Sequence, residues 1–209
     1  MEQCTVCGSC SKFFSKDKHR EYRICEQCDA IFVPEKFQIS SQEEFERYLK
    51  HQNNSDDKGY VQFLNPIVTY IEKNIGLNQT GLDFGSGPSK VLTQWLQKLG
   101  YKIDSYDPFF DPNTIFGEES YDFVIACEVI EHFRQPKNEF RRINQILKKG
   151  GKLICRTSLF SSDIDFGKWY YKNDKTHFIF YQEKTLKMIQ NLFGFSSLIS
   201  DKPLIIFTK

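Results

Sequence analysis

The segment Thr80-Gly81-Leu82-Asp83-Phe84-Gly85-Ser86-Gly87-Pro88 constrains this chain most, because it leads from an apolar strand through a glycine turn into a helix. Glycine lets the backbone approach a ligand closely and adopt dihedral angles that a side chain would forbid, which suits Gly85 and Gly87. Asp83 would end the buried strand facing an ammonium group, while free N–H groups at the helix start would face a carboxylate. Pro88 fits the first helical turn, where a missing N–H costs nothing.

Lys90 argues against a dinucleotide-binding site, because the fingerprint of such sites has a third glycine there for close helix packing. A Gly-x-Gly pair by itself also fits an ordinary tight turn. The segments that follow therefore decide whether this turn faces a ligand.

A second strand is expected at residues 101–107, ending in an acid 20 positions after Gly87. The carboxylate of Asp107 could accept hydrogen bonds from both hydroxyls of a ribose. Asp107-Pro108 is equally compatible with the start of a turn.

The next segments complete an α/β pattern. Residues 121–127 are almost continuously apolar, as in a strand buried on both faces. We expect a helix at 137–148, ended by Gly150-Gly151 in a left-handed cap, and a strand at 152–157. Alternating strands and helices specify a parallel sheet, which binds ligands at the carboxyl ends of its strands.

Helices before the sheet and a hairpin after it are also predicted. We expect a polar helix at about 42–50 and a second helix at about 60–75. After an amphipathic helix at 182–193, residues 195–199 and 204–208 should form an antiparallel hairpin at one edge of the sheet.

These motifs together resemble the class I S-adenosylmethionine-dependent methyltransferases, over roughly residues 60–209. The matching motifs are Leu82 to Pro88, Asp107, Tyr121-Asp122-Phe123-Val124, Glu128-Val129-Ile130-Glu131-His132 and Leu147-Lys148-Lys149-Gly150-Gly151. The resemblance implies an α/β, Rossmann-like sheet, mostly parallel with an antiparallel last strand, and S-adenosylmethionine as cofactor. The chain is similar to a bacterial group with an N-terminal zinc ribbon, whose members carry a block like Trp169-Tyr170-Tyr171-x-x-Asp174-x-Thr176-His177.

The resemblance places the cofactor against the strand ends and the segment before the first strand. The residues predicted to bind it are Asp83, Phe84, Gly85, Ser86, Gly87, Asp107, Pro108, Phe109, Glu128, Tyr48, His51 and Tyr60. The last three would cover the cofactor, although an exposed helix and its cap would also account for them.

The chain departs from this family after Asp107, because only the thirteen residues from Pro108 to Ser120 precede the next strand. A complete crossover takes at least about ten to twelve residues before its strands are counted. We therefore expect the third helix and strand to be shortened or lost. Asp111 could replace the acid that meets the adenine amino group in this family, and Phe109 or Phe110 could cover the adenine ring.

The second strong motif is Cys4-x-x-Cys7 with Cys25-x-x-Cys28, separated by seventeen residues. This spacing is typical of a tetrahedral zinc site with four thiolates, which leaves no open position and is therefore structural. Disulfides would need export, and the start Met1-Glu2-Gln3-Cys4 has no basic or apolar signal. Cys10 is also spaced to be a ligand, but Gly8 suits the turn after Cys7, so we leave Cys10 unbound.

The chain is thus divided into a zinc ribbon (1–38), a helical linker that covers the cofactor (39–59) and a methyltransferase domain (60–209). Residues 1–36 hold six basic and six acidic side chains. A ribbon that binds nucleic acid needs excess positive charge, so we expect a passive or protein-facing ribbon.

Methyl transfer is an in-line displacement, in which the protein aligns donor and acceptor and excludes water. A base is needed if the acceptor is a hydroxyl or a protonated amine. His177 is the first candidate, because it follows Trp169, Tyr170 and Tyr171, which could wall the acceptor. His132 and Glu131 come second, since similar Glu-His pairs lie near the acceptor in quinol-type O-methyltransferases.

The formal net charge of +1 over 209 residues points to neither nucleic acid nor membrane. No apolar stretch approaches the roughly twenty residues needed to span a bilayer, so we expect a cytoplasmic protein. The predicted function is methylation of O or N on a small molecule. RNA methylation, using the ribbon and the basic residues from Arg134 onward, and a non-catalytic zinc-ribbon module with a degenerate cofactor site are the alternatives.

Overall fold

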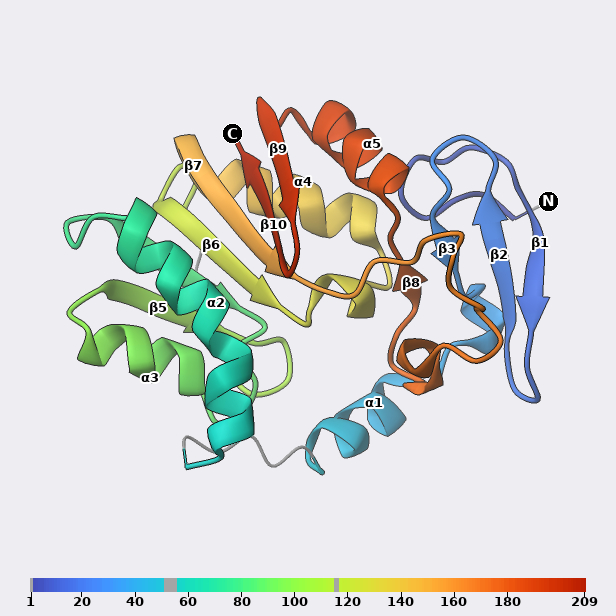
Figure 1. The fold of residues 1–209 in the computed structure, drawn as a ribbon, viewed down its shortest axis with the longest axis horizontal. Helices are drawn as coiled ribbons and strands as arrows, with labels where there is room; N and C mark the ends of the chain where they lie inside the picture. The colour runs from blue at the N-terminus through green and yellow to red at the C-terminus, as the bar shows by residue number, and fades with distance from the viewer. Residues whose placement is uncertain (1, 51–55, 115–116) are drawn as a thin grey trace.

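The computed structural model describes residues 2–50, 56–114 and 117–209, which form two β-sheets and their flanking helices (Figure 1). The larger sheet is built from β4 (Thr80–Phe84), β5 (Lys102–Tyr106), β6 (Tyr121–Cys127), β7 (Leu147–Arg156), β9 (Ser197–Asp201) and β10 (Leu204–Thr208). Its strand order is β5-β4-β6-β7-β10-β9. The smaller sheet is built from β1 (Ser11–Lys16), β2 (Glu21–Cys25), β3 (Ile31–Phe32) and β8 (Ile179–Phe180), in the order β1-β2-β3-β8.

The helices of the chain are α1 (Ser41–Tyr48), α2 (Lys58–Asn74), α3 (Val91–Lys98), α4 (Pro136–Ile146) and α5 (Glu183–Phe193). Short 3-10 turns lie at Glu35–Phe37, Ile130–His132 and Tyr170–Asn173. Local sequence sets several of these boundaries. Ser40 and Glu43 form a capping box at the start of α1, and Pro136 occupies the first turn of α4.

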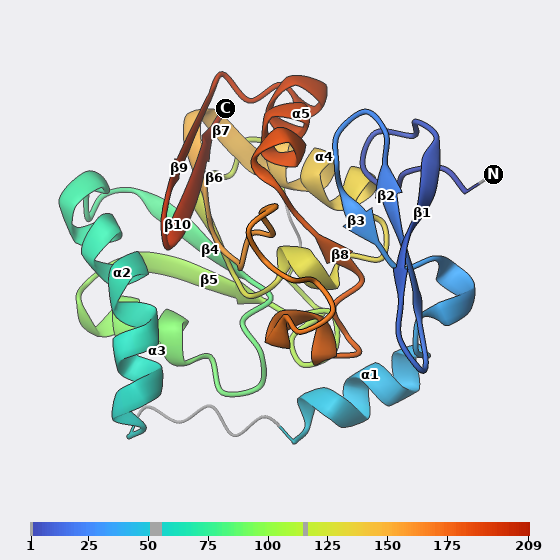
Figure 2. The ribbon, with the colours of Figure 1, turned by 45° about the vertical axis from the view of Figure 1, so that its right-hand side comes forward.

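Helices cover both faces of the large sheet (Figures 1 and 2). On one face, apolar side chains of α2 and α3 such as Leu64 and Leu96 join Phe123 and Ile125 of β6 in one buried cluster. On the other face, α4 and α5 share a cluster with Val124, and the cysteines of the small sheet belong to the same cluster. β6 is therefore buried on both sides, as its continuous apolar run predicts.

Strands β5, β4, β6 and β7 are parallel, whereas β10 runs antiparallel to both β7 and β9. This confirms the Rossmann-like α/β sheet and the antiparallel hairpin at its edge. The described residues between β5 and β6 form turns and one isolated bridge, Asp107 to Asp111, without a further helix or strand. The expected loss of the third helix and strand is confirmed for this part of the chain.

Two local predictions are wrong. Helix α4 ends at Ile146, and Gly150 lies inside β7 with φ +77° instead of capping the helix. A tertiary contact explains why Gly150 continues a strand. Its amide donates to Lys209 O, and the amide of Lys209 donates to Gly151 O. Pro88 lies in a turn before α3, which begins only at Val91 after the left-handed Lys90.

The small sheet combines distant parts of the chain. β1, β2 and β3 come from the first 32 residues, but the fourth strand, β8, follows the segment that carries His177. Ile31 pairs with Phe180 and Phe32 with Ile179, all antiparallel. The two sheets are thereby joined through the main chain as well as through side-chain packing.

Among the described residues, none of the helices combines the length and the apolar run that crossing a bilayer requires.

Gly81 offers a test of the packing in the large sheet. A Cβ at Gly81 would lie 2.1–2.6 Å from three ring atoms of Phe123 on the neighbouring strand. Gly81→Ala should therefore lower the free energy of unfolding by about 1–3 kcal/mol, measured by urea denaturation. Adding Phe123→Leu makes room for the methyl group and should recover part of this loss. A double variant that loses the sum of the two single effects would contradict this account.

Candidate active site

A cavity of about 960 Å³ opens at the carboxyl ends of β4, β5 and β6. The strand ends and following turns line it with Phe84, Gly85, Ser86, Gly87, Pro88, Tyr106, Asp107, Pro108, Phe109, Phe110, Cys127, Glu128, Val129, His132, Phe133, Arg134, Gln135 and Glu139. Its other walls are Ser41, Glu44, Arg47 and Tyr48 from α1, Tyr60 and Phe63 from α2, and Tyr170, Tyr171, Asn173, Asp174 and His177. The site thus combines four distant parts of the sequence.

The glycine turn after β4 is fixed by the end of β5. Gly85 and Gly87 have φ values of +83° and +65°, which favour glycine. The amides of Gly85 and Ser86 donate to Tyr106 O at 2.7 and 3.0 Å. A Cβ at Gly85 would lie 2.5 Å from Val129 Cγ2, so this position also has no room for a side chain.

The Asp107 carboxylate organises the turn that follows β5. Its Oδ2 accepts the amide of Gly87 at 3.0 Å, and its Oδ1 accepts those of Phe109 at 2.9 Å and Phe110 at 3.1 Å. Asp107 thus starts a turn and also lines the cavity, so both interpretations of the sequence apply. Each carboxylate oxygen has two lone pairs, which leaves capacity for a ligand hydroxyl.

Asp83 lies behind the cavity wall. Its side chain is 4% exposed and does not line the cavity, and its Oδ2 accepts a hydrogen bond from Thr93 Oγ1 at 2.7 Å. Burial raises the pKa of Asp83 to about 6. The structure thus does not bring Asp83 to the cavity surface, where the sequence predicts contact with an ammonium group.

Phe109 and Phe110 line the cavity, but Asp111 does not. The ring of Phe45 lies 5.9 and 5.5 Å from the rings of Phe109 and Phe110. Asp111 accepts hydrogen bonds from Lys90 Nζ and Ser105 Oγ, both at 2.7 Å. A flat ligand can therefore stack on the two phenylalanines without meeting this acid.

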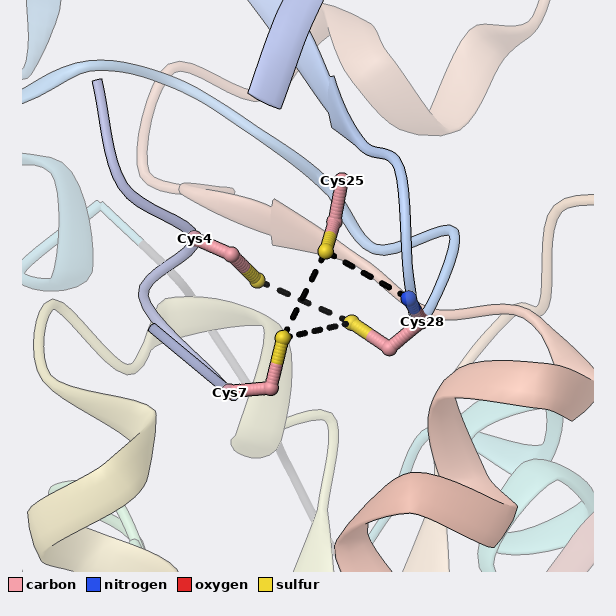
Figure 3. Close-up of side chains that lie close together, drawn as sticks. All are labelled: Cys4, Cys7, Cys25 and Cys28. Atoms are coloured by element: carbon pink, nitrogen blue, oxygen red, sulfur yellow. Dashed lines mark hydrogen bonds between the residues drawn. The ribbon is translucent and has the colours of Figure 1, made fainter. Parts of the chain in front are cut away.

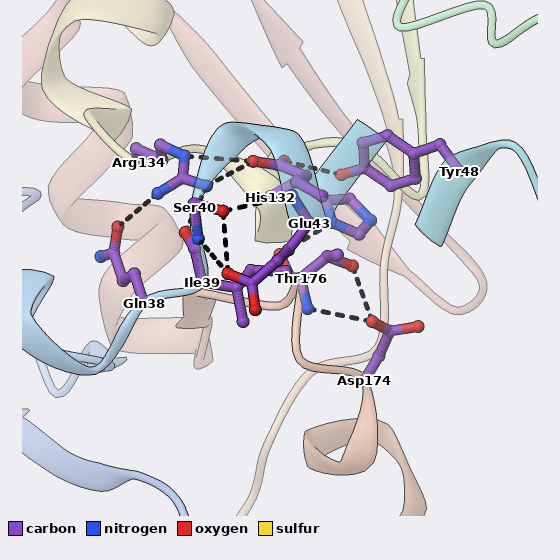
Figure 4. A network of polar contacts seen from close by, with 10 residues as sticks. Gln38, Ile39, Ser40, Glu43, Tyr48, His132, Arg134, Asp174 and Thr176 are labelled. Atoms are coloured by element: carbon purple, nitrogen blue, oxygen red, sulfur yellow. Dashed lines mark hydrogen bonds and ion pairs between the residues drawn. The ribbon is translucent and has the colours of Figure 1, made fainter. Parts of the chain in front are cut away.

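Helix α1 forms one wall of the cavity and is held there by ion pairs. Figure 4 shows the Arg134 side chain beside this helix. The Arg134 guanidinium donates to Glu44 from Nε at 3.1 Å and from Nη2 at 2.5 Å, and the Tyr48 hydroxyl donates to Glu44 at 2.9 Å. Arg47 reaches across to Asp174 at 2.8 Å. Helix α1 therefore contacts Arg134, which follows β6, and Asp174, which lies in the segment before β8.

Of the three residues predicted to cover the cofactor, the structure places two in the cavity lining. Tyr48 and Tyr60 line the cavity, and the Tyr48 ring lies 5.6 Å from the His132 ring. Burial raises the pKa of Tyr60 and of Tyr48. His51 lies outside the described residues.

Two neighbouring glutamates, Glu128 and Glu131, lie at and behind the cavity wall. Glu128 lines the cavity with φ +52°, whereas Glu131 is fully buried. The Tyr171 hydroxyl lies within hydrogen-bond distance of both carboxyl groups and of Thr157 Oγ1. Burial raises the pKa of both glutamates, and the neighbouring Glu128 raises that of Glu131 further. Glu131 Oε2 has no hydrogen-bond partner in the part of the chain that the structure describes.

His132 and His177 meet at one end of the cavity, with ring centroids 4.8 Å apart. His132 Nδ1 lies 2.9 Å from Thr176 O and His177 Nδ1 lies 2.8 Å from Tyr171 O. Because a carbonyl only accepts, each Nδ1 carries the proton and each Nε2 has the lone pair. Ligand atoms of these histidines and of Glu131 lie within 4.8 Å of one another, close enough to surround one water or one cation.

The four predicted cysteine ligands converge beside the small sheet, from the segment before β1 and from the end of β2 and the turn that follows it (Figure 3). Their Sγ atoms lie 3.6 Å apart for Cys4–Cys28, 3.4 Å for Cys7–Cys25 and 3.6 Å for Cys7–Cys28. A tetrahedron with Zn–S bonds of about 2.3 Å has sulfur–sulfur edges of about 3.8 Å, so the four thiols fit this metal. Cys10 is exposed and is not a member of the group.

The sequence did not point to Glu44 or Arg134 as site residues. Glu44 is 5% exposed although it lies in a helix whose composition is polar. Only the contact with a residue 90 positions away explains its burial. A carboxylate within an otherwise solvated helix gives no local signal of such a partner.

Comparison with known proteins adds a family to this geometry. A family model described as a methyltransferase domain matches residues 34–198. A ubiquinone biosynthesis O-methyltransferase from Citrobacter koseri is 28% identical over 82 residues, which are 39% of this chain and 34% of that protein. The chain thus matches about a third of the length of this curated relative.

Solved structures share the fold. The 1,6-didemethyltoxoflavin-N1-methyltransferase from Burkholderia thailandensis, with its substrate and S-adenosylhomocysteine bound, superposes with a TM-score of 0.56 at 12% identity. This match covers 95% of this chain and 99% of that one. A phosphoethanolamine N-methyltransferase 2 from Haemonchus contortus, with phosphomonomethylethanolamine and S-adenosylhomocysteine, has a TM-score of 0.51 at 17% identity, covering 75% of this chain and 42% of that one.

The pH dependence of stability tests the burial of His177. Burial lowers the pKa of His177 from 6.5 to about 4, so the unfolded chain takes up a proton that the folded protein does not. This contribution to stability is complete above about pH 6.5 and is lost as the pH falls towards 4. When the pH is lowered from 7 to 4.5, the free energy of unfolding should fall in both proteins. The fall should be about 2–3 kcal/mol smaller in His177→Gln than in the unmodified protein. His19→Gln, at an exposed position, is the control. Parallel pH profiles for His177→Gln and the unmodified protein would exclude a buried neutral imidazole.

Proposed function

Because the chain belongs to the methyltransferase domain family, we propose that it is an S-adenosylmethionine-dependent methyltransferase whose acceptor is a small molecule methylated at O or N. The observation that carries this proposal is the continuity of the cavity. One space of about 960 Å³ reaches from the glycine turn to Tyr171 and His177. Such a volume is at the upper end for small-molecule sites and suits a cofactor together with a small acceptor.

The strand ends are proposed to hold the cofactor. The Gly85–Gly87 turn leaves room for close approach of its amino acid part, and Asp107 accepts the ribose hydroxyls in addition to its three amides. Phe109 and Phe110 stack on the adenine, with Glu128, Tyr48 and Tyr60 around it. Asp83 would act on the ammonium group from behind the turn. Bound S-adenosylhomocysteine in both solved relatives supports this assignment.

The adjoining part of the cavity is proposed to hold the acceptor. Tyr171, His132 and His177 form this wall, with Arg47 and Arg134 already paired to Asp174 and Glu44. Acidic side chains outnumber basic ones in the lining, and both guanidinium groups are neutralised. An environment of this sign favours a neutral or cationic acceptor and disfavours the phosphates of RNA.

The named substrates of similar proteins support this choice. The two solved relatives have a toxoflavin precursor and phosphomonomethylethanolamine bound, and the curated relative acts in ubiquinone biosynthesis. All three names denote small acceptors.

The chemistry follows from the same side chains. S-adenosylmethionine supplies an electrophilic methyl group when bound, and the protein aligns the acceptor with it and excludes water under α1. The His177 imidazole is neutral at pH 7, because its pKa is about 4, and its Nε2 can accept the acceptor proton. A base this weak takes the proton only as the new bond to carbon forms. His132, with Glu131 beneath it, is placed to orient the same acceptor group.

The small sheet is proposed to bind one zinc ion through Cys4, Cys7, Cys25 and Cys28. The convergence of four thiols supports this, as do the amides of Gln27 and Cys28, which donate to Cys25 Sγ at 3.4 and 3.3 Å. Four thiolates complete a tetrahedral site, so this metal would be structural.

Binding of S-adenosylhomocysteine tests the cofactor site. Asp107→Ala should weaken its affinity at least about tenfold in calorimetry, because the variant loses both the ribose acceptor and the carboxylate that fixes Gly87. Asp111→Ala is a matched control four residues away, outside the cavity, and should stay within about twofold. Equal losses in the two variants would contradict the proposed role of Asp107.

Labelled cofactor tests the acceptor class. The purified protein should transfer label from S-adenosylmethionine to the small-molecule fraction of a cell extract, and His177→Gln should slow this about 100-fold or more, the usual size of a base effect. Label that enters RNA or protein instead would overturn the proposal. Affinity for S-adenosylhomocysteine should be unchanged in His177→Gln, which separates the acceptor end from the cofactor end.

A further inference from the structure

We propose that Arg20, in the small sheet, is a positioning residue for the acceptor wall of the methyltransferase. This inference goes beyond the proposed function and uses it in one respect, since it takes Tyr171 and His177 as the acceptor wall. Arg20 itself lies outside the cavity lining. It acts through the segment Tyr170–His177, whose main chain it binds.

The guanidinium of Arg20 binds three carbonyl oxygens of that segment. Nη2 donates to Lys172 O, and Nη1 donates to Asp174 O at 3.1 Å and to His177 O at 3.2 Å. Arg20 is only 5% exposed, so these bonds are shielded from water. Hydrogen bonds from a charged donor are stronger than neutral ones, and the planar fork fixes several acceptors at once.

The position of Arg20 is itself fixed within the turn between β1 and β2. The Arg20 amide donates to Asp17 Oδ1 at 2.8 Å, and the Tyr22 hydroxyl donates to Asp17 Oδ2 at 2.6 Å. The Arg20 guanidinium carbon lies 5.3 Å from the Tyr22 ring centroid. Asp17 and Tyr22 thus fix the Arg20 side chain that binds the three carbonyl groups.

The small sheet also binds the residues that follow His177. The amide of Val33 donates to Phe178 O at 2.8 Å, and β8 then pairs with β3. Tyr22 and Ile31 share a buried aromatic cluster with Trp169, Tyr171 and Phe180. The segment Tyr170–His177 therefore contacts the small sheet at both of its ends.

The opposite side of the segment rests on the turn after β6. Phe178 N donates to Glu131 O at 2.9 Å, and His132 Nδ1 lies 2.9 Å from Thr176 O. The glycine turn and Asp107 are fixed separately, by contacts within the large sheet. Loss of Arg20 should therefore disturb the acceptor wall and leave the cofactor end intact.

Hydrogen exchange measures this effect directly. In Arg20→Ala, amides in peptides spanning 170–180 should exchange at least about tenfold faster, because three main-chain carbonyls of this segment lose the guanidinium donor that they share. Arg23→Ala is the matched control, since Arg23 lies in the same hairpin and donates only to Ser11 and Glu21 in the hydrogen bonds of the described residues. The control should leave exchange at 170–180 unchanged.

Three further readouts separate positioning from general damage. Affinity for S-adenosylhomocysteine and the zinc-to-protein ratio should stay within about twofold in both variants. With the small-molecule fraction of a cell extract as acceptor, label transfer at saturating S-adenosylmethionine should fall at least about tenfold in Arg20→Ala and not in Arg23→Ala. Arg20→Lys keeps one cationic donor and should recover part of the rate.

Several results would overturn the inference. These are unchanged exchange at 170–180 in both Arg20 variants, equal loosening in Arg23→Ala, or a parallel loss of cofactor affinity. If Arg20→Ala fails to fold, Arg20→Lys decides by the same measurements. Exchange and cofactor binding do not depend on the acceptor class, so a failure of the small-molecule proposal would be seen separately, in the fraction that carries the label.

Discussion

The Asp107 carboxylate is the contact on which the proposed cofactor side of the cavity depends. It lies at the end of β5 and accepts hydrogen bonds from two turns. The amide of Gly87 belongs to the turn after β4, and those of Phe109 and Phe110 belong to the turn after β5. This bridge adds to the amides of Gly85 and Ser86, which already join the turn after β4 to Tyr106 O. With it, the glycine turn and the aromatic pair form one surface, which the shortened connection to β6 leaves open for a ligand. The truncation of the family's third helix and strand is thus compensated by one acid.

The proposed acceptor side of the cavity is built in a different way, from segments that are distant in sequence. Glu44 of α1 is buried against Arg134, and Arg47 of the same helix reaches Asp174 near the end of the chain. Beneath them, Tyr171 shares its hydroxyl between two carboxyl groups whose pKa values are raised by burial. Single ion pairs of this kind contribute little at a surface but fix geometry where water is excluded. The two ion pairs fix the position of helix α1 relative to His132 and His177.

Local sequence was sufficient for most of the sheet, because its signals are local. The apolar run of β6, the acids at the strand tips and the paired cysteines each lie within a few residues. Gly150 and Pro88 were misjudged because the C-terminal Lys209 and the left-handed Lys90 determine where the neighbouring elements begin and end. The convergence of His132 and His177 could be guessed only from resemblance, and Glu44 and Arg20 not at all, since their partners are distant in sequence.

The pairing of Ile31 with Phe180 also has a consequence for biosynthesis. The first three strands of the small sheet leave the ribosome early, but their fourth strand is made only when most of the chain is complete. Contacts of such long sequence separation form slowly and leave an unpaired strand edge exposed in the meantime. All four clustered thiols are likewise made before the partner strand arrives. The catalytic pocket would then be the last part of the protein to mature.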